Sequence, residues 1–201
     1  MPRTEEANQR IRAERRKQIL DVAAQVFAHK GLAGTRTADI AAACKMSEGL
    51  LFHYFASKED IFSAVVESAL QAAATPAQAV LQQLGSPLEK LRWLLQVSLP
   101  GMWSKPAYFL VILQALNSET TPEALRERVL EQSAHNLRIY QQLIVEGQTT
   151  GEVAQGDPAL LTLALAACIQ GLGSGVLHWP RLLGLSEPPD PEVALRLLKA
   201  C

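Results

Sequence analysis

Cysteine is scarce in this chain of 201 residues, and Cys44, Cys168 and Cys201 lie far apart in the sequence. A disulfide framework needs an even set of cysteines in a short secreted chain, so no such framework is expected. No pair of these cysteines has metal-ligand spacing, so no metal site is predicted. The first twenty residues are polar and rich in arginine, and they lack the apolar stretch of a secretory signal. We therefore expect a cytoplasmic protein.

The residue patterns of common enzyme sites are also absent. The sequence has no zinc-protease pair of histidines, no glycine-rich phosphate loop and no nucleophile elbow. Cys44 lies in a short alanine-rich segment and is interpreted as a small packing residue rather than a nucleophile. The sequence therefore predicts no catalytic residue, no cofactor and no enzymatic activity.

The chain as a whole lacks an excess of either charge, because 19 Lys and Arg stand against 20 Asp and Glu. The charge is nevertheless unevenly distributed. Residues 1–58 hold ten basic and six acidic residues, a formal charge of +4, whereas residues 59–201 hold nine and fourteen, a charge of −5. A basic first segment on an acidic body indicates that the first segment binds an anion. The alternative interpretation is an ordinary solvated helix face.

Strand signals are almost absent, and helix signals run the whole length. Between Arg10 and Ala28 apolar residues recur at steps of three and four, and Gly31 follows as a C-cap. Four later helices are expected to start at a capping residue followed by proline, which has the φ angle of a first helical turn. These pairs are Ser86-Pro87, Thr121-Pro122, Asp157-Pro158 and Asp190-Pro191. The helices expected after the first cover about 38–44, 48–54, 57–70, 87–103, 106–117, 122–150, 158–179 and 191–200. The fold class is all-α.

Two of these helices are short and are separated by three residues only. Thr37 is expected to cap the first and Ser47 the second. A short helix, a tight turn and another short helix form the geometry that presents a helix end to the major groove of DNA. Because neither helix is stable alone, both need support from the helices before and after them. The apolar residues expected to face that support are Ile40, Ala41, Met46, Leu51 and Phe55.

The remaining residues of this segment are expected on its outer face or in its turns. They are Thr35, Arg36, Thr37, Lys45, Ser47, Glu48, Gly49, Leu50, His53 and Tyr54, and Lys58 follows at the start of the next helix. Hydroxyls, an imidazole and a lysine can all bond phosphate oxygens, and Gly49 lets the backbone approach a duplex closely. The alternatives are that His53 is a core histidine and that Tyr54 serves only packing.

This segment resembles the DNA-binding signature of the TetR family. The resemblance covers roughly residues 15–63 and rests on Phe27-Ala28-x-Lys30-Gly31, Gly34 to Ala41, Met46 to Phe55 and Ser57 to Phe62. It implies a three-helix helix-turn-helix DNA-binding domain over residues 1–60 and a helical effector-binding and dimerisation domain over residues 61–201. It also implies a homodimeric transcriptional regulator, usually a repressor that a small ligand releases from a pseudo-palindromic operator.

The resemblance also implies roles for single residues. Thr37, Tyr54 and Lys58 would contact backbone phosphates. Residues expected at or near base edges and phosphates are Thr35, Ser47, Gly49, Leu50 and His53, and the DNA-binding set is completed by Arg36, Lys45 and Glu48. Two departures stand out: Lys45 occupies the place of the usual turn glycine, and Leu50 and Phe52 replace the common Thr and Tyr. Lys45 is thus expected in a left-handed conformation, where it can add a phosphate contact.

The basic residues near the N-terminus are predicted to form an arm that reaches DNA, because each neutralised phosphate releases counterions. They are Arg10, Arg12, Arg15, Arg16 and Lys17. The alternative is a solvated helix face.

The large apolar residues of the body are expected to form its core and to leave a mostly apolar effector pocket. The predicted pocket residues are Trp93, Val97, Trp103, Phe109, Leu113, Leu116, Tyr140 and Gln170. The runner-up function is therefore a helical small-molecule carrier that has lost specific DNA binding, which Lys45, Leu50 and Phe52 favour.

Residues 158–177 carry no charge, which raises a membrane-spanning helix as an alternative. Thr162, Gln170 and Ser174 and the lack of a flanking basic cluster argue against it. A stripe of small residues in this segment allows close approach of another helix. We therefore expect the helices at about 158–179 and 191–200 to form a two-fold interface with a second copy.

Overall fold

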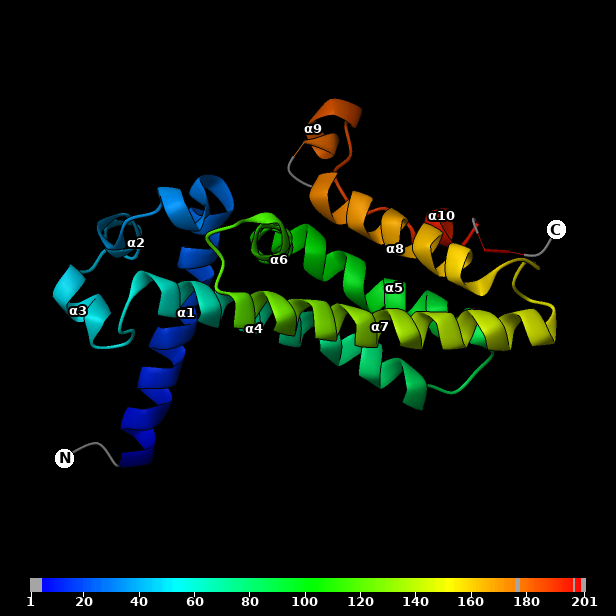
Figure 1. The fold of residues 1–201 in the computed structure, drawn as a ribbon, viewed down its shortest axis with the longest axis horizontal. Helices are drawn as coiled ribbons and strands as arrows, with labels where there is room; N and C mark the ends of the chain where they lie inside the picture. Colours follow the sequence, from blue (N-terminus) through cyan, green and yellow to red (C-terminus); the bar gives the residue numbers. More distant parts are fainter. Residues whose placement is uncertain (1–4, 176–177, 197, 200–201) are drawn as a thin grey trace.

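The computed structural model describes residues 5–175, 178–196 and 198–199, and this part of the chain is helical with no β-strand. The helices are α1 (Glu5–Gly34), α2 (Thr37–Ala43), α3 (Glu48–Phe52), α4 (Lys58–Ala79), a 3₁₀ turn (Val80–Gln82), α5 (Pro87–Ser104), α6 (Pro106–Asn117), α7 (Glu123–Thr150), α8 (Pro158–Gly175), α9 (Trp179–Leu183) and α10 (Pro191–Leu195). Helices α1 to α3 lie at one end of an elongated molecule, and α5, α7, α8 and α10 form most of the other (Figure 1). The predicted all-α fold is confirmed.

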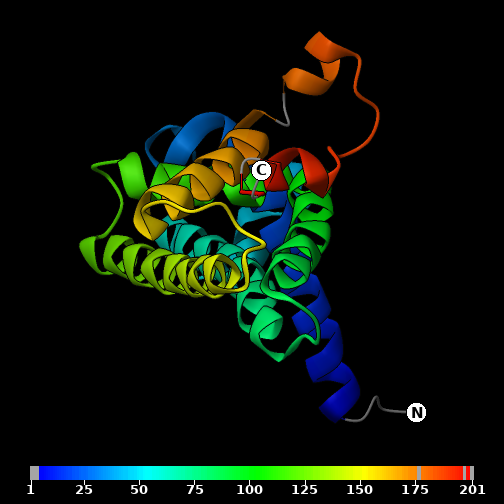
Figure 2. The ribbon, with the colours of Figure 1, turned by 90° about the vertical axis from the view of Figure 1, so that its right-hand side faces the viewer.

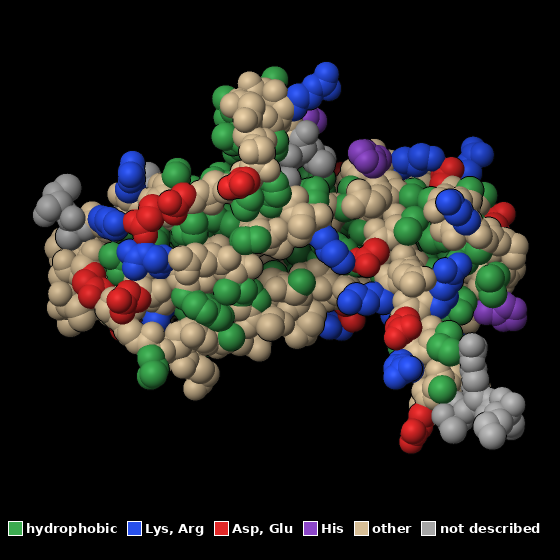
Figure 3. All heavy atoms as spheres, turned by 180° about the vertical axis from the view of Figure 1, so that it is seen from behind, with side chains coloured by type: hydrophobic (Ala, Val, Ile, Leu, Met, Phe, Trp, Pro, Cys, Tyr) green, Lys and Arg blue, Asp and Glu red, His purple; other side chains and the backbone are tan. Residues whose placement is uncertain are grey.

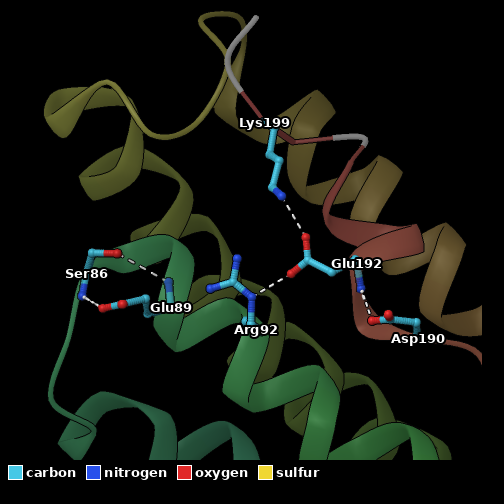
Figure 4. Close-up of polar contacts among 6 residues, drawn as sticks. All are labelled: Ser86, Glu89, Arg92, Asp190, Glu192 and Lys199. Carbon is cyan, nitrogen blue, oxygen red and sulfur yellow. Dashed lines mark hydrogen bonds and ion pairs between the residues drawn. The ribbon is translucent and has the colours of Figure 1, made fainter.

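Capping side chains fix several helix starts where the sequence predicts them. Ser57 Oγ accepts a hydrogen bond of 3.0 Å from the Asp60 N–H at the start of α4. At the start of α5, Ser86 Oγ accepts from the Glu89 N–H while Glu89 Oε2 accepts from the Ser86 N–H at 2.8 Å (Figure 4). Asp157 caps α8 in the same way, through the Ala159 N–H at 2.8 Å. These bonds satisfy amide groups that have no partner within the helix.

Two predicted caps are wrong. Thr37 is the first residue of α2 rather than its cap, because the chain enters the helix at Arg36, whose N–H donates to Asp39 Oδ2 at 2.9 Å. Helix α7 begins at Glu123, one residue later than predicted, with Pro122 in the cap position. The Thr121 hydroxyl is buried and makes no hydrogen bond among the described residues, so it caps nothing.

The last two predicted helices are also too long. Helix α8 ends at Gly175 instead of residue 179, and a separate short helix starts at Trp179. The indole of Trp179 packs so closely on Gly175 that a Cβ there would collide with the ring. Helix α10 ends at Leu195 instead of residue 200. Of the residues beyond, Lys199 forms an isolated bridge with Val153, and residues 197 and 200 lie outside the described part.

Two hydrophobic cores hold the molecule together. The first joins α1 to α4 with α6 and the start of α7, and at its centre the rings of Phe27 and Phe62 meet edge to face with centroids 5.1 Å apart. The second joins the remainder of α7 with α5, α8 and α10 around Leu91, Leu143 and Leu165. The predicted division between residues 60 and 61 falls inside α4, and the first core crosses it.

A polar junction links α1 to the first turn of α6. Asp21 Oδ1 accepts hydrogen bonds of 2.8 Å from Lys105 Nζ and from the Tyr108 hydroxyl. Partial burial raises the pKa of Asp21, but these two donors outweigh burial and hold the pKa below its usual value. Burial and the Asp21 carboxylate both raise the pKa of Tyr108. At the other end of α6, Gln114 Nε2 donates to the carbonyl oxygen of Ala28 at 3.0 Å.

A charged cluster fixes the C-terminal segment to α5. Glu192 on α10 bridges Arg92 Nε at 2.5 Å and Lys199 Nζ at 2.6 Å (Figure 4). The Ala154 N–H donates to the carbonyl oxygen of Leu198 at 2.8 Å. Hydrogen bonds from Lys199 and Arg92 lower the pKa of Glu192 from 4.5 to about 2.

We predict that Glu192→Gln lowers the melting temperature at pH 7. Because the folded pKa lies below the unfolded one, the carboxylate stabilises the fold above about pH 4.5, and this contribution is lost as the pH falls towards 2. Thermal unfolding followed by circular dichroism should thus show a difference between the two proteins that shrinks over this range. Glu127→Gln is the matched control, because Glu127 is exposed and forms no ion pair within the described residues. An equal effect of both substitutions would contradict the prediction.

Candidate nucleic-acid interface

The short helices α2 and α3 each keep one apolar side buried against α1 and α4. Ile40 and Ala41 of α2, Leu51 of α3 and Phe55 just after it are all at most 2% exposed. The predicted supporting face is therefore confirmed. The opposite side of α3 lies open at the end of the molecule (Figure 1).

The turn between the two helices has a left-handed residue. Lys45 has a φ of 54°, the one positive φ of a residue other than glycine in the described ranges. Its N–H donates to the carbonyl oxygen of Ala42 at 3.0 Å, and the Met46 N–H donates to that of Ala41 at 3.0 Å. The predicted left-handed conformation of Lys45 is confirmed. A side chain in this region costs about 1–2 kcal/mol.

Side-chain hydrogen bonds set α2 and α3 relative to each other. The Thr37 hydroxyl donates to Glu48 Oε2 at 2.6 Å, which joins the first residues of the two helices. Asp39 accepts from the Arg36 N–H and forms an ion pair of 2.9 Å with Lys30 of α1. The hydrogen bond from Lys30, followed by that from Arg36, lowers the pKa of Asp39. Ser47 caps α3 as predicted, by accepting from the Leu50 N–H at 3.2 Å.

The basic residues near the N-terminus lie on a regular helix rather than on an extended arm. Two of them reach back to the end of α3: Arg12 Nη2 donates to the carbonyl oxygen of His53 at 3.3 Å, and the Arg16 guanidinium lies 4.6 Å from the centroid of the Phe55 ring. Figure 3 shows Lys and Arg side chains on this end of the molecule, beside the projecting start of α1. The helix therefore carries two of its positive charges next to the C-terminal end of α3.

Ten of the eleven predicted DNA-binding residues reach the surface of this end of the molecule. The exposed ones are Arg36, Lys45, Ser47, Glu48, Gly49, Leu50 and His53, and the half-buried ones are Thr37, Tyr54 and Lys58. The interpretation of His53 as a core residue is therefore wrong. Tyr54 packs in part against the first core, so packing is one of its roles.

Thr35 does not belong to this surface. It is 1% exposed, and its hydroxyl donates to the carbonyl oxygen of Gly31 at 2.6 Å. Gly31 has a φ of 69°, which breaks the end of α1, and the Thr35 hydroxyl satisfies the carbonyl that this break frees. The expected position of Thr35 near base edges is wrong for this reason.

The sequence patterns do not predict the contacts of Arg12 and Arg16 with the end of α3. These residues lie four positions apart, which places them on one face of α1. That spacing indicates a shared face of α1, but it does not indicate that this face contacts α3.

The predicted effector-pocket residues occupy different environments in the single chain. Trp93, Trp103, Phe109, Leu113, Leu116 and Tyr140 are half-buried, whereas Val97 is 47% exposed and Gln170 is also exposed. Burial raises the pKa of Tyr140. A polar cleft of about 320 Å³ between α4 and α7 is lined by other residues, namely Glu67, Leu70, Gln71, Arg128, Glu131 and Gln132.

The arrangement of α2, its turn and α3 on the support of α1 and α4 defines a helix-turn-helix DNA-binding protein. A family model described as bacterial regulatory proteins of the tetR family matches residues 19–65. A second model, described as the C-terminal domain of tetracyclin repressor-like proteins, matches residues 84–188, more than half of the chain. The chain belongs to the TetR family of transcriptional regulators.

Individual relatives agree with this assignment. The transcriptional repressor KstR2 of Mycolicibacterium smegmatis is 34% identical over 99 residues, which span 49% of this chain and about half, 48%, of that repressor. The transcriptional regulator BetI of Paraburkholderia phymatum is 28% identical over 196 residues, 93% of this chain and 90% of BetI. The solved structure of the ketosteroid transcriptional regulator KstR2 of Mycobacterium tuberculosis has the same fold, with a TM-score of 0.76, 20% identity and coverage of 93% and 96%. The alternative of a helical carrier is not favoured.

We predict that Lys45→Gly weakens DNA binding without lowering stability. Glycine relieves the left-handed conformation, and its larger entropy in the unfolded chain offsets part of that gain. Removal of the ammonium group should reduce affinity for DNA and lower the slope of its salt dependence by about one for each phosphate that is no longer neutralised. Chemical denaturation and fluorescence anisotropy at several salt concentrations measure the two effects. Lys45→Ala is the control, because it removes the ammonium group but keeps the left-handed cost. Unchanged affinity in both variants would exclude Lys45 from the phosphate contacts.

Proposed function

We propose that this protein represses transcription by binding as a homodimer to a pseudo-palindromic operator, from which a small, mostly apolar ligand releases it. Each subunit would insert α3 into one major groove. The two half-sites would then lie about one helical turn of DNA, roughly 34 Å, or a multiple of it, apart. Membership of the TetR family supports this proposal.

The observation that carries the proposal is the open outer face of α3, bordered by groups that bind phosphate. Gly49 lies on this face, and a Cβ added there would have no heavy atom within 4 Å, so the backbone is free to approach a duplex. Lys45 precedes the helix and Lys58 follows it at the start of α4. One cation before α3 and one after it can bind the phosphates on both sides of a groove while α3 contacts the bases.

The apolar surface of α8 supports a dimer through this helix. Leu160 and Leu163 are 64% and 63% exposed, and Ala164, Ala167 and Gln170 continue the same exposed stripe. By length and composition α8 is the one described helix that could cross a membrane. Only 22% of it is buried, so most of its apolar surface is uncovered in the single chain. An apolar helix face of this kind needs a cover, and a second α8 related by a two-fold axis supplies one of the same chemistry.

Helix α9 extends this apolar surface. It stands away from the body (Figure 2), and Leu182 and Leu183 are 75% and 68% exposed. The ring of Trp179 rests on Gly175 and reaches towards Gly171, which directs the start of this segment along α8. We therefore assign α9, with α8 and α10, to the interface between two copies.

The effector is proposed to bind where α5, α6 and α8 meet. Phe109 and Met102 lie so close to Gly173 that a Cβ there would collide with both side chains, so a ligand at this place must displace them. Trp93 and Tyr140 pack at the edge of the second core nearby. Aromatic and aliphatic walls with few polar groups favour an apolar ligand.

Footprinting on the DNA upstream of the gene for this protein tests the proposed function. We expect a protected pseudo-palindrome in the presence of the wild-type protein. Lys58→Ala should weaken binding by a similar factor on every sequence and reduce its salt dependence, because a phosphate contact carries no sequence information. Arg138→Ala is the control for the lost charge, since Arg138 is exposed on α7, away from α3. A weak shift that shows no sequence preference and vanishes at moderate salt would refute the proposal.

We predict that Leu163→Glu disrupts the dimer. Burial of a leucine is worth about 1.5–3 kcal/mol and occurs twice in a two-fold interface, so the dimer should dissociate about a hundredfold more readily or more. Analytical ultracentrifugation measures the change, and binding to the two-half-site operator should weaken in parallel. Leu84→Glu is the matched control, because Leu84 is 97% exposed and lies outside α8 to α10. A Leu163→Glu protein with the wild-type dimer affinity would place the interface elsewhere.

A further inference from the structure

Two large apolar side chains lie on the open side of α3. Leu50 is 42% exposed and Phe52 is 50% exposed, whereas Leu51 between them is 1% exposed and belongs to the first core. Leu51 is the one buried residue of α3. Leu50 and Phe52 therefore do not serve that packing, although each keeps a hydrophobic surface in water.

The helical geometry puts these two side chains on either side of the outermost line of α3. Successive residues are turned by about 100° around a helix axis. Gly49 and His53 thus point in nearly the same outward direction, with Phe52 about 60° to one side of Gly49 and Leu50 about 60° to the other side of His53. Because Gly49 has no side chain and its Cβ position is open, His53 is the one side chain between Leu50 and Phe52 on this face.

The chemistry of the major groove leaves one partner for such side chains. Leu50 and Phe52 have no hydrogen-bonding group, so they cannot pair with the donors and acceptors on base edges. The apolar group that base pairs present in the major groove is the C5-methyl group of thymine. Contact with it removes apolar surface of both partners from water.

We infer that Leu50 and Phe52 determine specificity by contacting thymine methyl groups in each half-site. The inference rests on the proposed function, since it requires α3 to lie in a major groove. Ser47, Lys45 and Lys58 then position the helix through the DNA backbone, and His53, whose ring is exposed between the two apolar side chains, supplies the polar contact of the same surface. The half-site is thus expected to contain thymines on both sides of the base pair that faces Gly49.

Replacement of thymine by deoxyuracil tests this inference, because it removes the methyl group and leaves the base-pairing edges intact. DNA sites are first selected from a random pool with the full-length wild-type protein. Each thymine of the selected site is then replaced singly, and affinity is measured by fluorescence anisotropy at fixed salt. We expect about fourfold weaker binding for each contacted methyl group, from the value of one buried carbon, and no change at other thymines.

The variants Leu50→Ala and Phe52→Ala assign the methyl groups to side chains. Each should bind the selected site more weakly and should no longer distinguish thymine from deoxyuracil at its own position, while it keeps the distinction at the other. Leu50→Met retains an apolar side chain and should retain the distinction. Leu84→Ala, far from α3 in the sequence and exposed, is the control. Thermal unfolding of every variant verifies the fold, and both tested side chains are exposed enough that we expect little change.

The outcomes separate this inference from the function on which it rests. If selection enriches no sequence, the proposed function is wrong and the inference with it. If a sequence is enriched but deoxyuracil has no effect at any position, the function stands and the inference is overturned. A deoxyuracil effect that persists unchanged in both alanine variants overturns the assignment to Leu50 and Phe52.

Discussion

The geometry of the DNA-binding end depends on the contact between α1 and α4. Helices α2 and α3 have seven and five residues, too few to be stable in water alone. They keep their shape because Ile40 and Leu51 are buried in a core that Phe27 of α1 and Phe62 of α4 build together. The position of α3 is therefore a property of that core, and the polar contacts of Thr37, Asp39 and Ser47 refine it.

The same core joins the DNA-binding end to the body. Val111 and Val129, from α6 and α7, are fully buried in it, and α4 runs from the helix-turn-helix into the body without a break. The two parts differ in charge and in task, but they share hydrophobic packing. A signal from the body to α3 would thus pass through packed side chains rather than through a flexible linker.

The sequence determines the helix positions where a local interaction decides them. The helix at 106–117 begins and ends where predicted, and the caps at Ser47, Ser57 and Ser86 are confirmed, because each depends on residues within a few positions. Predictions failed where distant contacts decide. Helix α10 ends at Leu195, and the residues after it contact a distant segment instead: Lys199 forms a bridge with Val153, and the Leu198 carbonyl oxygen accepts from the Ala154 N–H.

The candidate site shows the same division. The left-handed Lys45 follows from the resemblance to the family signature, in which a glycine usually stands at this place, and the supporting face of α2 and α3 follows from periodicity. The burial of Thr35 does not, because it results from a hydrogen bond to a carbonyl that the break at Gly31 sets free. The contacts of Arg12 and Arg16 with the end of α3 depend on the angle between α1 and α3, which only the tertiary structure fixes.

The attachment of α6 to α1 has a mechanical consequence. Lys105 and Tyr108 hold the first turn of α6 on Asp21, and Gln114 holds its last turn on the backbone at Ala28, so the two helices must move as one piece. A ligand that pushed on α6 from inside the body would therefore tilt α1, and with it α3, whose C-terminal end contacts Arg12 and Arg16 of α1. In the proposed homodimer such a tilt would change the distance between the two α3 helices. Two α3 helices that must fit half-sites roughly 34 Å apart would then no longer match the operator.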